Sequence, residues 1–272
     1  LALPLALAQL AQFFMGVVDF ACVGRYSPEA MAGVAIGNSL SWGLSSIGLG
    51  ITMALDPLIA QALGAGEEQR AYQWWRVGRV VALLVGLPLV ICAVVLAANL
   101  HLFGIEEVLA QETFYYVLAR GPAQFGFLVY FAGRSYLQAL GRTKPLVLAA
   151  IVSNIVNLVL DLLLVFGDEG LVSVGLPAVG IRPMGAMGVG FTTACSSVVL
   201  ALMIVVGARY YGPKDRVWKG PKLPKRTMLR LGLPIGIQVA GESWLFASCG
   251  VLAGSFGAVA SSAHQVGLTM AA

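Results

Sequence analysis

Two long stretches of the sequence contain no charged side chain. They run from Ala30 to Leu55 and from Val80 to Phe103. Each is longer than the roughly 20 residues that cross a bilayer as an α-helix. Charged residues make up 11% of the whole chain, whereas soluble domains carry roughly 25%. The sequence therefore predicts an all-α integral membrane protein, built as a polytopic bundle of apolar helices.

The apolar segments and the loops between them predict a topology. Spans are expected at about 1–24, 31–60, 77–103, 113–137, 145–167, 187–211 and 229–255, with another beginning near 260. Loops two, four and six are rich in Lys and Arg, and the sixth, RYYGPKDRVWKGPKLPKRTMLR, is the most basic. By the positive-inside rule these loops are cytoplasmic, and so is the N-terminus. Because the basic residues follow membrane topology, nucleic acid is not an expected partner.

An ungapped repeat divides the chain into two parts. The motif LALP at Leu1 returns as LGLP at Leu231, and the same offset aligns Gly24 with Gly254. An even number of spans precedes the second copy, so the repeat is parallel, a plan known in secondary transporters. The expected units are a six-helix lobe at 1–211, a basic cytoplasmic linker at 212–228 and the truncated start of a second lobe at 229–272. The chain ends inside an apolar run, which predicts a fragment of a longer protein.

Three acidic residues, Asp19, Asp161 and Glu242, fall well inside predicted spans. A charged side chain at the centre of a membrane helix costs roughly 2.5–3.5 kcal/mol on insertion scales. Such residues usually face the interior of a bundle or a watery cavity. A carboxyl group in apolar surroundings can take up and release a proton, which suits a coupled pump. We therefore expect a functional role for these acids.

Each acid ends a polar stripe on one helical face, because its polar neighbours are spaced three or four residues apart. The stripes comprise Gln9, Gln12 and Asp19; Asn154, Asn157 and Asp161; and Gln238 and Glu242. The amides Gln9, Gln12, Asn154 and Gln238 are candidates to line a cavity. The alternative is that they only bond helices to one another, as polar residues often do in membrane bundles. The spacing does not decide between these readings for the amides.

Other polar residues in or near the spans are expected to be structural. Asp56 lies near a membrane face, and Arg134 is close enough to the same face to extend its charged group to the interface or to pair with an acid. The cysteines form no CxxC pair, and no HExxH or similar catalytic motif appears. Neither a resident cofactor, nor a metal site, nor an enzymatic activity is therefore predicted.

Several stretches together resemble the bacterial branch of the multidrug and toxic compound extrusion (MATE) antiporters. The resemblance covers essentially the whole chain. It rests on FFMGVVDFACVGRYSPEAMAGVAIG, DPLIAQALGAGE, RSYLQALGRTKP, NIVNLVLDLLLVFG, GAMGVGFTTA, LGLPIGIQVAGESWLF and SSAHQVGLTMA, which occur in that order. The family has twelve spans in two six-helix lobes, so the resemblance implies that about five spans are absent from this chain.

The resemblance also implies a function and a site. Family members export amphipathic, often cationic, compounds by alternating access in exchange for protons or sodium ions. Asp19, Asn157, Asp161 and Thr193 match the cation site of the N-terminal lobe, and Glu242 matches a residue implicated in coupling in the C-terminal lobe. The coupling ion stays open. A monomer in the bacterial inner membrane is expected, with small cationic substrates and membrane lipids as its partners.

Two other functions are alternatives to drug export. The first is a flippase for lipid-linked oligosaccharides from the same broad superfamily, whose cavity would be lined by bases that hold phosphates. The deep charges of this sequence are mainly acidic, which disfavours it. The second is a membrane-embedded hydrolase with two aspartates. FGDEG at 166–170 lacks the first glycine of a GxGD motif, so this alternative is disfavoured too.

Overall fold

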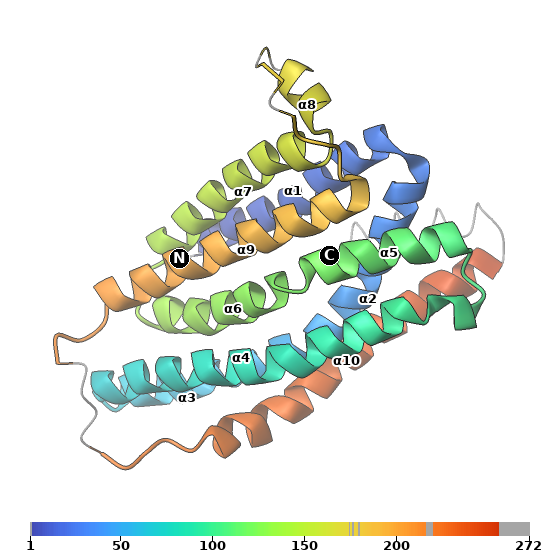
Figure 1. Ribbon diagram of the computed structural model, residues 1–272. Helices are drawn as coiled ribbons and strands as arrows, with labels where there is room; N and C mark the ends of the chain where they lie inside the picture. Colours follow the sequence, from blue (N-terminus) through green and yellow to red (C-terminus); the bar gives the residue numbers. More distant parts are fainter. Residues whose placement is uncertain (1, 174, 176, 179, 216–219, 256–272) are drawn as a thin grey trace.

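Helices form all the regular elements in the part of the chain that the structure describes. This computed structural model describes residues 2–173, 175, 177–178, 180–215 and 220–255, without the side chains of 2–8, 11–12, 173, 246–248 and 250–255. The helices are α1 (Ala2–Tyr26), α2 (Pro28–Met53), α3 (Leu55–Gly64), α4 (Glu68–Ala98), the 3₁₀ turn η1 (Leu100–Phe103), α5 (Glu107–Arg120), α6 (Ala123–Ala139), α7 (Lys144–Leu164), α8 (Asp168–Ser173), α9 (Gly185–Tyr210) and α10 (Lys225–Ser255) (Figure 1). The predicted polytopic all-α architecture is confirmed.

Among the described residues, four helices are long and apolar enough to cross a bilayer. They are Pro28–Gly64, Glu68–Ala98, Lys144–Leu164 and Gly185–Tyr210. They coincide with the second, third, fifth and sixth predicted spans. The first, fourth and seventh correspond to α1, to α5 with α6, and to α10. The span expected from about 260 lies outside the described residues.

Local sequence signals set the ends of several helices. Ser27 is the N-cap of α2, and its hydroxyl accepts a hydrogen bond from the N–H of Ala30 at 3.1 Å. Pro28 occupies the first helical position, where its missing N–H costs nothing. The turn after α6 contains Gly141 at φ +69°, a left-handed conformation that glycine adopts without a steric penalty.

The fourth predicted span is not one continuous helix. The predicted span covers about 113–137, whereas in the structure α5 ends at Arg120 and α6 begins at Ala123. Gly121 and Pro122 separate the two helices, and the N–H of Gly121 reaches the carbonyl of Leu118 at 3.3 Å. Proline has no N–H to donate and crowds the preceding turn, so the helix is interrupted inside the bundle.

Glycines allow helix backbones to approach one another closely. A Cβ added at Gly126 of α6 would lie 2.5 Å from the carbonyl oxygen of Ser197 on α9. A Cβ at Gly50 of α2 would meet the backbone of Gly236 on α10. Small residues at such crossings permit the tight van der Waals packing that drives helix association in membranes.

α10 packs along α2 and so connects the last part of the described chain to the first nine helices (Figure 1). It begins at Lys225, within the segment predicted to be the linker. α9 ends at Tyr210, one residue before the expected boundary of the first lobe. The division into a six-helix lobe, a linker and the start of a second lobe stays a prediction.

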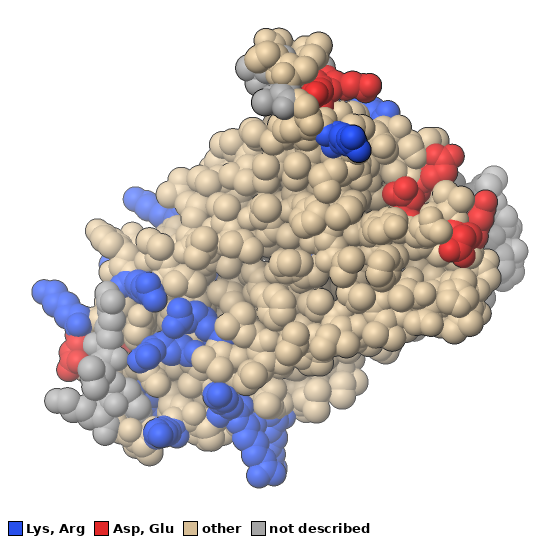
Figure 2. Space-filling model, in the orientation of Figure 1, with Lys and Arg blue, Asp and Glu red and all other residues tan. Residues whose placement is uncertain are grey.

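The two ends of the described bundle carry opposite charges. Figure 2 shows most of the Lys and Arg side chains on this face at the end where α4 begins and α6 turns into α7. Most of the Asp and Glu side chains on this face lie at the other end, where α5 begins. The uncharged surface between them suits a bilayer core. This arrangement fits the expected topology, although which end is cytoplasmic stays a prediction.

Candidate functional site

A buried polar cluster forms where α1, α7 and α9 meet. Asp19 comes from α1, Asn157 and Asp161 lie one turn apart on the same face of α7, and Thr193 comes from α9. The exposed fractions of these side chains are 7% for Asp19, 1% for Asn157, 0% for Asp161 and 9% for Thr193. The four residues that the family resemblance suggested thus converge in space.

Asp19 is the centre of this cluster. Its Oδ1 accepts a hydrogen bond from Nδ2 of Asn157 at 2.8 Å, and its Oδ2 accepts one from the hydroxyl of Thr193 at 3.2 Å. Hydrogen bonds to an ionised acceptor are about twice as strong as those between neutral groups. The two donors therefore fix the orientation of the Asp19 carboxyl between α7 and α9.

The other side of the cluster contains buried acceptors that have no hydrogen-bond partner in the described part of the chain. Both carboxyl oxygens of Asp161 and Oδ1 of Asn157 are buried without a hydrogen-bond partner among the described residues. Unpaired buried acceptors are costly. The cluster is therefore suited to bind a proton or a hard cation that prefers oxygen ligands.

Thr193 can respond to the charge on Asp19. Its hydroxyl lies 3.2 Å from Oδ2 of Asp19 and 2.9 Å from the carbonyl of Val189, but it has a single hydrogen to donate. Beside an ionised Asp19 the hydrogen is donated to the carboxylate. Beside a protonated Asp19 it can turn to Val189, so that the hydroxyl oxygen accepts from the acid.

A cavity of about 1020 Å³ adjoins the cluster. Asp19 and Thr193 line it, whereas Asn157 and Asp161 lie behind them and do not. The volume is at the upper end of the roughly 300–1,000 Å³ typical of sites for small molecules. Asp19 is thus the acid of the cluster that faces both the buried acceptors and the cavity.

The remaining predicted residues lie in different places. Gln9 lines the cavity, as expected. Asn154 is not among the residues that line this cavity, and its Nδ2 donates to the carbonyl of Ala150, one turn earlier in α7, at 2.8 Å. The side chain of Gln12 lies outside the described residues.

Gln238 and Glu242 of α10 are not part of the buried cluster. Both are exposed in the described chain, and Nε2 of Gln238 donates to Oε1 of Glu242 at 3.1 Å. Neither residue lines the cavity of the first nine helices. The expectation that Gln238 lines a cavity is therefore not met by this cavity. The role implied for Glu242 in a second lobe stays a prediction.

The sequence analysis did not single out Arg120, and it expected Asp56 and Arg134 to be structural. All three line the cavity. Nε of Arg134 donates to Oε1 of Gln138 at 3.3 Å, and its guanidinium lies over the ring of Phe131 at 5.4 Å. The signal for Arg120 was present in the sequence, because an arginine inside an apolar span directly precedes a Gly-Pro pair that breaks helices.

The fold defines the chain as an all-helical, polytopic membrane protein. A family model, MatE, matches residues 4–163. The chain is 32% identical over its whole length to a "Probable multidrug resistance protein NorM" of Bradyrhizobium diazoefficiens. It is 31% identical, over 98% of its length, to "Multidrug resistance protein MdtK" of Yersinia pestis. The chain belongs to the MatE family, the MATE transporters, which confirms the resemblance, and it spans 58% of the length of both relatives.

Solved structures of low sequence identity share the fold. The eukaryotic MATE transporter AtDTX14 superposes with a TM-score of 0.79 at 23% identity, over 92% of this chain and 54% of that one. A MOP superfamily transporter from Pyrococcus furiosus, described as having a binding pocket of reverse polarity, has a TM-score of 0.73 at 18% identity, over 93% and 53% of the two chains. The charges of a cavity in this fold must therefore be established for each chain.

Proposed function

We propose that the full-length protein is a secondary active transporter that exports small amphipathic compounds in exchange for protons or sodium ions. Family membership and relatives named as multidrug resistance proteins support this proposal. The observation that carries it is the position of Asp19, which links the unpaired acceptors of the cluster to the cavity. No catalytic chemistry is part of the proposal. A monomer in the inner membrane, surrounded by lipid, is the expected setting.

The proposed mechanism is competition for Asp19. An ionised Asp19 attracts the cationic group of a substrate that enters the cavity. A proton or sodium ion bound among Asp19, Asp161, Asn157 and Thr193 neutralises this charge, and the substrate is then released. Such an exchange is productive when ion and substrate each favour a different conformation of the protein. Alternating access, with a further contribution from Glu242 in the second lobe, completes the proposal.

Separate ion gradients identify the coupling ion. We expect full-length protein in proteoliposomes to move a fluorescent organic cation when a pH gradient or a sodium gradient is imposed alone. Transport under one gradient and not the other names the ion. A lack of response to both gradients, in vesicles that hold folded protein, would contradict ion-coupled exchange.

Replacing Asn157 by Ala tests whether sodium binds in the cluster. The change removes both the donor to Asp19 and the unpartnered Oδ1 acceptor. Loss of such a group typically costs about 10-fold in cation affinity. We therefore expect the sodium concentration for half-maximal transport to rise by about that factor. An unchanged sodium dependence, with Asn154→Ala as the control on the same helix, would show that sodium is not bound there.

One observation favours the rival function of a lipid-linked oligosaccharide flippase. The deep charges of the sequence were expected to be mainly acidic, but Arg120 and Arg134 balance Asp19 and Asp56 in the cavity lining. Bases in such a cavity could hold the phosphates of a lipid carrier. Reconstituted full-length protein decides between the two, because a flippase moves a lipid-linked pyrophosphate across the bilayer without exporting organic cations.

A further inference from the structure

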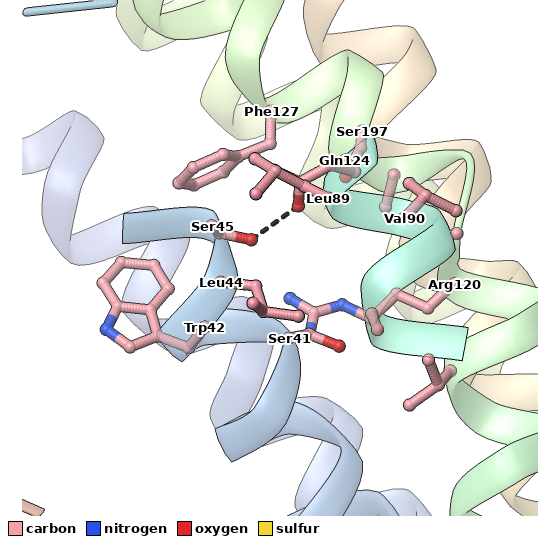
Figure 3. A pocket seen from close by; sticks show the side chains of 14 residues that line it. Ser41, Trp42, Leu44, Ser45, Leu89, Val90, Arg120, Gln124, Phe127 and Ser197 are labelled. Atoms are coloured by element: carbon pink, nitrogen blue, oxygen red, sulfur yellow. Dashed lines mark hydrogen bonds between the residues drawn. The ribbon is translucent and has the colours of Figure 1, made fainter. Parts of the chain in front are cut away.

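A small side pocket lies beside the cavity, between α2, α4, α5 and α6. Its volume is about 50 Å³, and Trp42, Arg120, Phe127 and Ser197 line both this pocket and the cavity. Figure 3 shows Gln124 and Arg120 in it, with the guanidinium of Arg120 extending toward Ser41 and Leu44. A group of the size of a carboxylate, attached to a larger molecule in the cavity, fits this space.

Gln124 presents an unused hydrogen-bond donor in this pocket. Its Oε1 accepts from the hydroxyl of Ser45 at 2.5 Å, a distance that suits O–H···O and is too short for N–H···O. The amide is therefore oriented with its oxygen toward Ser45. Its Nε2 is buried and has no partner among the described residues. A buried donor without an acceptor is costly, unless a ligand supplies the acceptor.

Arg120 adds a positive charge to the same pocket. Its NH1 donates to Oδ1 of Asn38 at 3.1 Å, and its guanidinium lies 5.7 Å from the ring centroid of Tyr116. Neither partner carries a negative charge. Within the described residues no carboxylate lies within 4.0 Å of Arg120. The guanidinium has five N–H groups in a fork that matches a carboxylate. Asp19 is close enough to interact with Arg120 electrostatically but forms no salt bridge with it. An arginine inside a membrane bundle that has no carboxylate in direct contact is a candidate for a functional site.

We propose that Arg120 and Gln124 form an anion subsite that binds the carboxylate of the transported compound. This inference rests on the proposed export function and narrows its substrate class. Asp19, which also lines the cavity, attracts an amine, so the favoured ligands carry both an amine and a carboxylate. Trp42 and Phe127, with ring centroids 5.9 Å apart, add an aromatic surface at the pocket.

Equilibrium binding of two dyes to purified full-length protein tests the subsite. Tetramethylrhodamine has a free carboxylate, and its methyl ester has the same ring system without that charge. We expect wild-type protein to bind the free acid more tightly than the ester. Arg120→Gln should weaken binding of the free acid by about 10- to 100-fold, as expected for loss of a hydrogen bond to a charged group. Binding of the ester should change by less than about threefold.

A second variant and a control distinguish loss of the subsite from a folding defect. Gln124→Glu keeps the size of the side chain and places a carboxylate beside Arg120, so it should abolish the preference for the free acid and spare the ester. Arg142→Gln removes the same charge at an exposed position outside both pockets, and should leave both dyes unaffected. Thermal unfolding of each variant reports its folding.

Several outcomes would overturn the subsite. One is equal loss of both dyes in Arg120→Gln, because the arginine would then hold the cavity together. Another is a preference for the ester in wild-type protein. A third is loss of the preference for the free acid when chloride replaces gluconate, which would assign the pocket to a free anion. Because binding is measured without transport, failure of ion-coupled export leaves this test intact.

Discussion

Full-length protein with Asp19→Asn should lose gradient-driven efflux of a fluorescent cation by about 100-fold, a factor that corresponds to roughly 3 kcal/mol and to the removal of a buried, hydrogen-bonded charge. The amide cannot be ionised, so it neither attracts the cationic substrate nor exchanges it for a proton or sodium ion. Asn157 and Thr193 remain in place beside it. Dye fluorescence in proteoliposomes under an imposed ion gradient measures the effect.

A second acid variant and a control on the same helix complete this experiment. Asp161→Asn should also abolish coupled efflux, because it removes the buried acid behind Asp19. Asn154→Ala should transport at the normal rate, because the Asn154 amide bonds only to its own helix in the described chain. If Asp19→Asn and Asp161→Asn both transport at the wild-type rate, the competition mechanism is wrong.

Gly126→Leu should prevent α6 and α9 from packing together. The first added carbon would already lie 2.5 Å from the carbonyl oxygen of Ser197 and 2.6 Å from its carbonyl carbon. Both contacts are with backbone, which cannot rotate away as a side chain can. Overpacking of a tight contact typically costs about 1–3 kcal/mol, and a clash of leucine with backbone belongs at or above about 3 kcal/mol. We expect a lower yield of folded protein and a lower unfolding temperature.

Gly64→Ala provides the matched control for the glycine prediction. Nothing lies within 4 Å of a Cβ added at Gly64, at the end of α3. Alanine is a better helix former than glycine by about 1 kcal/mol, so this variant should be as stable as the wild type or more stable. Wild-type stability in Gly126→Leu would mean that the α6–α9 crossing is looser than its geometry indicates.

Ser197 connects the α6–α9 crossing to the cavity. This residue forms the close crossing with Gly126 and also lines both the cavity and the side pocket. Thr193, one turn earlier in α9, bonds to Asp19. The packing of α6 against α9 therefore positions one wall of the cavity relative to the ion cluster. A small shift of α9 would alter both the cluster and the cavity.

The sequence alone determined the class of protein and most of the spans, and it singled out Asp19 and Asp161 as acids inside spans. These properties are local: the length of an apolar run sets whether it spans a bilayer, and spacing of three or four residues sets which side chains share a face. The placement of Asn157 and Asp161 on one face of α7 followed from spacing. Their meeting with Asp19 was suggested only through the family resemblance.

The tertiary structure decided which polar faces converge. Asp19 meets Asn157 and Thr193 across 138 and 174 residues of chain, whereas Asn154 turns back to its own helix and Gln238 and Glu242 bond to each other. It also showed that Arg120, at the helix break, lines the cavity and forms no salt bridge within the described residues. The physical reason is that the rotation and crossing of each helix depend on all the side chains packed against it, and no local pattern contains that information.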